Sequence, residues 1–342
     1  MNTKQITSFL LITLMFAFGS LNAQKVEKSK LKYGGYGQKK FNNGEKKIFI
    51  EQFTISYQYI YAKTEKKRGG KQLGGGYLGD AKAALFLGLG NIDPHELQKI
   101  TDKTYKEFTG KLKNAGFTIL TGNDFKDHSY YDNAEINTGG KPTEYYQGFI
   151  STAPTGETFL NKGYGIFNTT LKTSNQLDGT IVARVNIIIP FAEDGESQGS
   201  KALVKTFGGV AKVVAKPNLR IGKTTIQTKS KLGFDKYNTV STNYDIGYKT
   251  DLKYQAWHMV NINKEIAIQG VLPNKKFKAV KSANQDLNGT QVGNYNVFNV
   301  PSAELKKMQN IDFDTTKYYN GVGEAIDYYM NSATDKFVSF IN

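Results

Sequence analysis

The residues of this chain that could perform chemistry begin with a serine between glycines. Gly195-Glu196-Ser197-Gln198-Gly199 has the spacing of a nucleophile elbow, in which a sharp turn after a strand exposes the serine. His258 follows in the order of a catalytic triad, with three acids between them: Asp235, Asp245 and Asp251. However, Pro190 and an acidic turn precede Ser197, and β-branched residues follow it where a helix should begin. We therefore expect a hairpin turn here, and a serine hydrolase is the second alternative function.

Glycine-rich segments give no better indication of a nucleotide cofactor. Gly222-Lys223-Thr224 matches the end of a phosphate-binding loop, whose amides and lysine hold a nucleotide. Pro217 stands where the first glycine of that loop should be, and the residues that follow alternate like a strand. The glycines in residues 69–79 lack the spacing of a dinucleotide fingerprint. We expect no cofactor.

Potential metal ligands are sparse. The histidines lie far apart in the sequence, in a helix start, a loop and a strand: His95, His128 and His258. Asp124 with Asp127, and Asp312 with Asp314, bring carboxylates together, but without the glycine and terminal glutamate of a calcium loop. The sequence therefore predicts no metal site, no catalytic residue and no enzymatic activity.

Aromatic and basic residues indicate binding instead. Residues 24–71 contain thirteen Lys or Arg against four Glu. Tyrosines recur there at every second position of a strand, so they share one face, and a basic glycine-rich loop follows. We predict that this face and loop bind a partner through Tyr57, Tyr59, Tyr61, Lys66, Lys67, Arg68 and Lys71. The alternative is a buried aromatic face beside lysines that only meet solvent.

The first 23 residues predict export. Lys4 precedes an apolar run over residues 9–18, and Ala23 is a small residue before Gln24, as in a cleaved signal peptide. No cysteine follows, so neither a lipidated cysteine nor a disulfide is available, and no second apolar run predicts a stable transmembrane anchor. For a periplasmic protein, the net charge of +15 favours an anionic glycolipid, an acidic polysaccharide or an acidic protein surface over nucleic acid.

The elements that must position these residues begin after a predicted basic, flexible arm over residues 24–47. We expect one large domain over residues 48–342, with residues 121–165 as the place where it could divide. A strand starts at Ile48, and residues 77–90 read as either a small-residue helix in the core or a segment that touches lipid or an apolar partner. Asp93-Pro94-His95-Glu96 has the cap, the proline and the glutamate of a helix start.

That helix ends at Gly116 before a strand over residues 117–120, which gives a strand-helix-strand unit with parallel strands if both lie in one sheet. Strand patterns are then dense over residues 165–300, including residues 180–190, 202–215 and 256–262. Helices are predicted for residues 301–308 and from Thr315 onward. The fold class is α+β: an N-terminal strand-helix-strand unit joined to a largely antiparallel, meandering sheet, with a C-terminal amphipathic helix.

Several of these pieces occur in the same order in known exported domains: Ile48-Phe49-Ile50, the helix over residues 93–115, the strand at residues 179–182 and the late helix. In this order, about half of the chain resembles the periplasmic part of curli-secretion-channel lipoproteins and the N-terminal domain of the Tol-system propeller protein. The chain departs from them in lacking a lipidation cysteine and in carrying Thr121-Gly122 where an acidic-basic pair is usual. A channel-forming role is therefore not transferred.

The resemblance implies a periplasmic, non-catalytic protein that docks on other envelope components. The Asn-, Lys- and Tyr-rich composition is similar to that of Bacteroidota proteins. We therefore expect a binding or assembly protein that docks on an outer-membrane protein complex, with an accessory or plug subunit of a protein-export machinery as its specific form. The alternative is an envelope protein that binds carbohydrate or glycolipid.

Overall fold

The computed structural model describes residues 24–67, 70–71, 77–78, 81–144, 146–162, 169–196, 211–229, 235–250, 254–281, 289–292, 295–298 and 308–341. Its centre is a seven-stranded sheet with the order β10-β3-β12-β18-β19-β2, in which β8 also pairs with β3. The strands are β2 (Lys32–Tyr36), β3 (Lys47–Gln58), β8 (Thr118–Leu120), β10 (Phe149–Thr152), β12 (Ile181–Ile189), β18 (Asn243–Lys249) and β19 (Gln255–Asn261). Strand β3 runs parallel to β12 and β8, and the other pairs are antiparallel.

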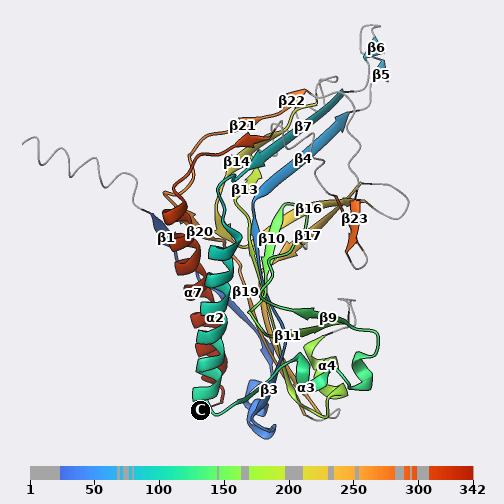
Figure 1. Cartoon of the computed structure of the whole chain (residues 1–342), viewed down its shortest axis with the longest axis vertical. Helices are drawn as coiled ribbons and strands as arrows, with labels where there is room; N and C mark the ends of the chain where they lie inside the picture. The colour runs from blue at the N-terminus through green and yellow to red at the C-terminus, as the bar shows by residue number, and fades with distance from the viewer. Residues whose placement is uncertain are drawn as a thin grey trace, which may run out of the picture.

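Two long helices, α2 (Pro94–Asn114) and α7 (Thr315–Val338), lie side by side along the central sheet in the same direction (Figure 1). Each starts at an aspartate cap: Asp93 accepts a hydrogen bond from the His95 amide, and Asp314 accepts one from the Lys317 amide. Lys103 and Asp327 form an ion pair at 2.7 Å between the helices, and Lys111 and Asp335 form another at 2.5 Å.

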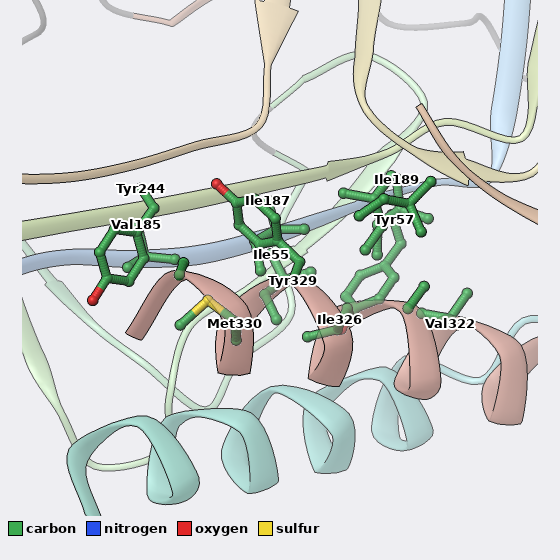
Figure 2. Packing of buried hydrophobic residues seen from close by; sticks show 14 of the residues in the cluster. Ile55, Tyr57, Val185, Ile187, Ile189, Tyr244, Val322, Ile326, Tyr329 and Met330 are labelled. Carbon is green, nitrogen blue, oxygen red and sulfur yellow. The ribbon is translucent and has the colours of Figure 1, made fainter. Parts of the chain in front are cut away.

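Both helices bury an apolar stripe against the sheet. Figure 2 shows Val322, Ile326 and Tyr329 of α7 packed on Ile187 and its neighbours from β3 and β12. Helix α2 adds Phe108, whose ring lies 5.7 Å from that of Phe53 in β3. Apolar residues at every second position of the strands pack against apolar residues spaced three or four apart in the helices. Together they form one continuous core between the sheet and the helices.

The opposite face of the sheet is covered over part of its area by short elements from the middle of the chain. They are α3 (Gly122–Phe125), η3 (Ser129–Tyr131), β9 (Glu135–Thr138), β11 (Thr158–Asn161) and α4 (Thr170–Gln176). A second cluster lies beneath them, formed by Phe49, Tyr131, Leu160, Leu177 and Val182. Because β10, in the same stretch of chain, pairs with β3, residues 121–162 contribute both to this cover and to the central sheet.

Smaller sheets extend from the central sheet toward the top of Figure 1. One contains β4 (Ile60–Lys67), β7 (Ala81–Gly88), β22 (Val280–Lys281) and β25 (Gln309–Asn310), and another contains β13 (Ala192–Asp194), β14 (Val214–Pro217) and β21 (Phe277–Lys278). A third joins β1 (Lys25–Glu27), β15 (Arg220–Ile221) and β20 (Ile266–Gln269). The remaining strands are β5 (Gly70–Lys71) with β6 (Tyr77–Leu78), and β16 (Lys223–Lys229), β17 (Asp235–Ser241), β23 (Gly289–Val292) and β24 (Tyr295–Phe298).

The predicted α+β class is confirmed, including the parallel strand-helix-strand unit β3-α2-β8, the largely antiparallel strand pairing and the C-terminal helix. Two local predictions are corrected. Residues 24–47 are not a flexible arm, because β1 and β2 join sheets and Phe41 in η2 (Gln38–Asn43) is buried. Residues 81–88, in the segment read as either a core helix or a segment that touches lipid or an apolar partner, form β7: it pairs with β4, and Ala83, Leu85 and Leu87 share one buried face. The helix predicted at residues 301–308 falls almost wholly outside the described residues.

None of the helices that the structure describes combines the length and the apolar composition needed to cross a membrane.

Candidate interaction surface

The three tyrosines predicted to form one binding face do not lie together on a surface. Tyr57 is fully buried, and its hydroxyl lies 3.2 Å from that of Thr101 in α2. Strand β3 ends at Gln58 and β4 begins at Ile60, so the alternation is interrupted at Tyr59. Tyr61 is also buried, in the sheet of β4. Burial raises the pKa of Tyr57 and of Tyr61, which keeps both phenols neutral inside the protein.

Tyr59 is the partly accessible member of this set. Its hydroxyl donates to Glu144 at 3.4 Å, and burial is the main cause that raises its pKa to about 12. The basic residues predicted beside it cannot be added to a site: Arg68 and the side chains of Lys66, Lys67 and Lys71 lie outside the described part of the chain. The structure thus places Tyr57 and Tyr61 in the core, as in the buried alternative.

The candidate triad also lacks an accessible histidine. His258 is fully buried on the helix-facing side of β19, where its ring lies 5.3 Å from that of Phe340 and 6.0 Å from that of Tyr244. Among the described residues, neither of its ring nitrogens has a hydrogen-bond partner. Burial lowers its pKa to about 4. Ser197 lies outside the described residues.

A buried ionic network lies on the other face of the central sheet. It contains the candidate triad acid Asp245 together with Arg184 and Glu51, which the sequence analysis did not single out. Arg184 in β12 donates from Nε to Glu51 in β3 at 2.5 Å, and Tyr131 donates to the same carboxylate at 2.8 Å. Next to Arg184 in the register, Asp245 in β18 accepts hydrogen bonds from Thr170 and from Trp257. These groups lie beneath α4 and are mutually satisfied, so they hold the layers together and leave no group directed at a ligand.

The structure instead exposes aromatic and basic residues along β2, the edge strand of the central sheet. Strand β2 pairs with β19 on one side, and no described strand pairs with its other edge. Tyr33 and Tyr36 are 42% and 47% exposed, and Tyr254, just before β19, is 48% exposed. Within the described residues these are three of the four large hydrophobic side chains that are exposed. We call strand β2, with its exposed Lys32, Tyr33 and Tyr36 and the neighbouring Lys39 and Tyr254, the β2 edge. Tyr33 lies on the helix-facing side of the sheet with His258, and Tyr36 lies on the opposite side with Trp257.

The β2 edge is strongly basic. Residues 24–47 contain eight lysines and two glutamates. Lys30, Lys32 and Lys39 are exposed, and no acid forms an ion pair with them among the described residues. Two ring contacts hold β2 against β19: the Tyr36 ring packs edge-on to that of Trp257 at 6.0 Å, and the Tyr33 ring stacks on that of His258 at 6.4 Å. An unpaired strand edge with cationic flanks can accept an extended acidic segment.

The sequence contained a weak signal for the β2 edge. Lys32-Tyr33-Gly34-Gly35-Tyr36 has two aromatic residues within five, but its two glycines are typical of a loop and obscure the strand. Gly35 adopts a φ of +113°, and a side chain there would collide with the Trp257 carbonyl. Gly35 therefore weakens the strand pattern in the sequence, and it also allows β2 to approach β19 closely.

A metal site receives no support from the described residues, in which no three metal-ligating side chains gather. Among the described residues, the candidate site is the β2 edge. Comparison of the chain with protein-family models, with curated proteins and with solved structures finds no match.

Proposed function

We propose that this chain is a non-enzymatic binding or assembly protein of the periplasm, which docks on an outer-membrane protein complex through the β2 edge. The single observation that supports this most is the unpaired edge of a seven-stranded sheet, flanked by exposed tyrosines and lysines. The predicted signal peptide supports the compartment. An accessory or plug subunit of a protein-export machinery is the specific form of the proposal.

The partner segment is expected to be extended and acidic. Main-chain hydrogen bonds to β2 would supply affinity that does not depend on sequence, and the lysines would select carboxylates. The same lysines oppose pairing of β2 with a second copy of itself, because like charges would meet across the new strand pair. Specificity thus comes from one repulsive and one attractive effect of the same side chains.

Site-specific photo-crosslinking in detergent-solubilised envelopes tests the proposal. A photoreactive residue in place of Tyr36 should capture one outer-membrane protein, identified by mass spectrometry, and the same residue in place of His95 at the exposed start of α2 should not. Lys32→Glu combined with Lys39→Glu should reduce capture at least about tenfold, since two favourable charge pairs become repulsive. Lys106→Glu combined with Lys172→Glu is the matched control, with the same change in net charge at exposed positions away from β2.

Two outcomes would count against this function. Equal capture by the two double variants would remove the β2 edge from the interaction. Recovery of no membrane protein, together with retention of the chain on an acidic polysaccharide column, would favour the alternative of a carbohydrate- or glycolipid-binding protein. The hydrolase alternative is not proposed, because His258 is enclosed by aromatic rings.

A further inference from the structure

A cavity of about 530 Å³ lies on the small sheet formed by β13, β14 and β21, away from the β2 edge. Figure 1 shows this sheet in the upper part of the molecule. The volume is within the range of small-molecule sites, which is about 300–1,000 Å³. Its lining contains Val214 and a mixture of acids and lysines: Glu193, Asp194, Glu196, Lys212, Lys216, Lys276 and Lys278.

The strand register explains why these side chains meet. Glu193 in β13 is paired with Lys216 in β14, and Val214 in β14 is paired with Lys278 in β21. Paired residues of neighbouring strands point to the same face, and so do residues two apart along one strand. Lys212 and Lys276 precede these two strands and line the same cavity. Phe277 and Ala215 alternate with the lining residues and are buried on the other face.

Two of the acids in this cavity are already neutralised by neighbouring cations. Glu193 binds Lys216 at 2.8 Å and accepts a hydrogen bond from Asn218 at 2.9 Å. Burial acts to raise its pKa, but these contacts outweigh burial and hold the pKa below its usual value, so the carboxylate is ionised and paired. Asp194 binds Lys63 at 2.7 Å.

Three lysines are then left without an acid. Lys212, Lys276 and Lys278 are exposed, and within the described residues none of them forms an ion pair. Like charges that converge on one cavity repel each other, and an anion bound between them would relieve that repulsion.

We propose that this cavity binds a phosphate monoester carried on a sugar or on a lipid headgroup, with Lys212, Lys276 and Lys278 as the groups that hold the phosphate. Lysine binds phosphate as a point charge with three donors, and several lysines can share one phosphate without the planar geometry that arginine demands. The volume exceeds that of a bare phosphate, and Val214 offers an apolar contact to the group that carries it. This site goes beyond the proposed docking and does not rest on it.

Isothermal titration calorimetry on the chain from Gln24 onward tests the site with four probes: glucose 6-phosphate, glucose, inorganic phosphate and vesicles of phosphatidylcholine with or without phosphatidic acid. At low salt we expect heat from at least one phosphate-bearing probe and none from glucose. Binding should weaken as the ionic strength rises, because the attraction is carried by exposed charges. Binding of glucose 6-phosphate assigns a soluble sugar phosphate, and binding of phosphatidic acid vesicles alone assigns a lipid headgroup.

Substitutions locate the phosphate. Lys212→Gln with Lys278→Gln should weaken binding at least about tenfold, because two charge-assisted hydrogen bonds are lost. Glu196→Gln should strengthen it about twofold to fivefold, because it removes a lining acid that forms no ion pair within the described residues. This gain cannot result from misfolding. Lys106→Gln with Lys172→Gln is the control for net charge and should leave affinity unchanged.

The proposal is overturned if no phosphate-bearing probe binds to the unmodified chain. It is also overturned if the Lys212→Gln and Lys278→Gln variant binds as tightly as the control variant, since the phosphate would then lie elsewhere. Capture by the β2 edge is measured separately, so failure of one site leaves the result for the other unaffected.

Discussion

The guanidinium of Arg184 and the carboxylate of Glu51 form a 2.5 Å ion pair inside the protein, where both side chains are almost fully buried. The pair joins β12 to β3, neighbouring strands that run parallel at the centre of the sheet. Tyr131 adds a hydrogen bond from the layer above. Glu51 is therefore the acid in direct contact with the buried guanidinium, with the Asp245 carboxylate beside it in β18.

Glu51→Gln should lower the free energy of unfolding by about 3–5 kcal/mol, because it leaves the Arg184 charge buried without its counter-ion. Urea unfolding followed by circular dichroism measures the loss. Glu51→Leu combined with Arg184→Met should cost less than the sum of the single changes, since it removes both charges. The comparison is Asp327→Asn, which breaks the exposed pair with Lys103 and should cost less than about 1 kcal/mol. Equal losses from Glu51→Gln and Asp327→Asn would show that burial does not set the strength of the internal pair.

Two glycines of α7 should respond oppositely to alanine. A Cβ on Gly321 would lie 2.5 Å from Cγ2 of Ile268 in β20, whereas a Cβ on Gly323 would meet nothing within 4 Å. Gly323→Ala should raise the free energy of unfolding by about 0.5–1 kcal/mol through helix propensity. Gly321→Ala should lower it by about 1–3 kcal/mol, because the helix must move away from the sheet. Thermal unfolding of the two variants checks this, and a stabilised Gly321→Ala would mean that α7 does not approach β20 so closely.

Two neighbouring glycines, Gly34 and Gly35, test the close approach of β2 to β19. Gly35→Ala should lower stability by about 2 kcal/mol, because the residue has a φ of +113° and its new methyl group would collide with the Trp257 carbonyl. Gly34→Ala meets only the flexible side chain of Met259, with Cγ at 3.0 Å, and should cost less. Amide hydrogen exchange of residues 32–36 measures the effect locally. Similar exchange in both variants would contradict the pairing of β2 with β19.

His258 should make stability depend on pH. An unfolded histidine has a pKa near 6.5, and burial lowers the pKa of His258 to about 4 in the folded chain. The unfolded state therefore binds the proton first as the pH falls. The contribution of His258 to the free energy of unfolding is complete above about pH 6.5. It declines as the pH falls toward 4, by about 3 kcal/mol in all. Asp245 acts with the opposite sign, because burial raises its pKa.

Urea unfolding of the unmodified chain and of His258→Phe, between pH 7 and pH 4.5, separates the two effects. The difference between the proteins isolates His258, because Asp245 and the surface carboxylates are common to both. We expect the variant to lose less stability on acidification. Parallel pH profiles would show that the imidazole is not desolvated in the folded state.

The sequence allowed the long and strongly patterned elements to be predicted, because their local signals agree with the final packing. The cap at Asp93 marks the start of α2, and the β-branched run at residues 181–189 marks β12. Residues 81–88 could not be assigned from the sequence, because alanine favours helices and only pairing with β4 makes the segment a strand. Tertiary contacts decide such segments, and they are not visible in a window of the sequence.

The surface was harder to predict than the fold, for a related reason. Tyr57 and Tyr61 follow the period-two pattern of a strand with one free face, but α2 covers Tyr57, and the break at Tyr59 moves Tyr61 into another sheet. Charged residues inside apolar runs, such as Glu51 and Arg184, were the available signal for the buried network. Which of the exposed lysines converge on one cavity depends on the register of three strands that are distant in sequence.

The parallel pairing of α2 with α7 joins two segments that are far apart in the sequence. The ion pairs Lys103–Asp327 and Lys111–Asp335 both join residues that are 224 positions apart. Helix α7 (Thr315–Val338) covers part of the helix-facing side of the central sheet. A growing chain cannot bury that part of the core before this helix is synthesised. Until α7 is synthesised, the apolar residues that it covers stay exposed, which makes them accessible to chaperones in a growing chain.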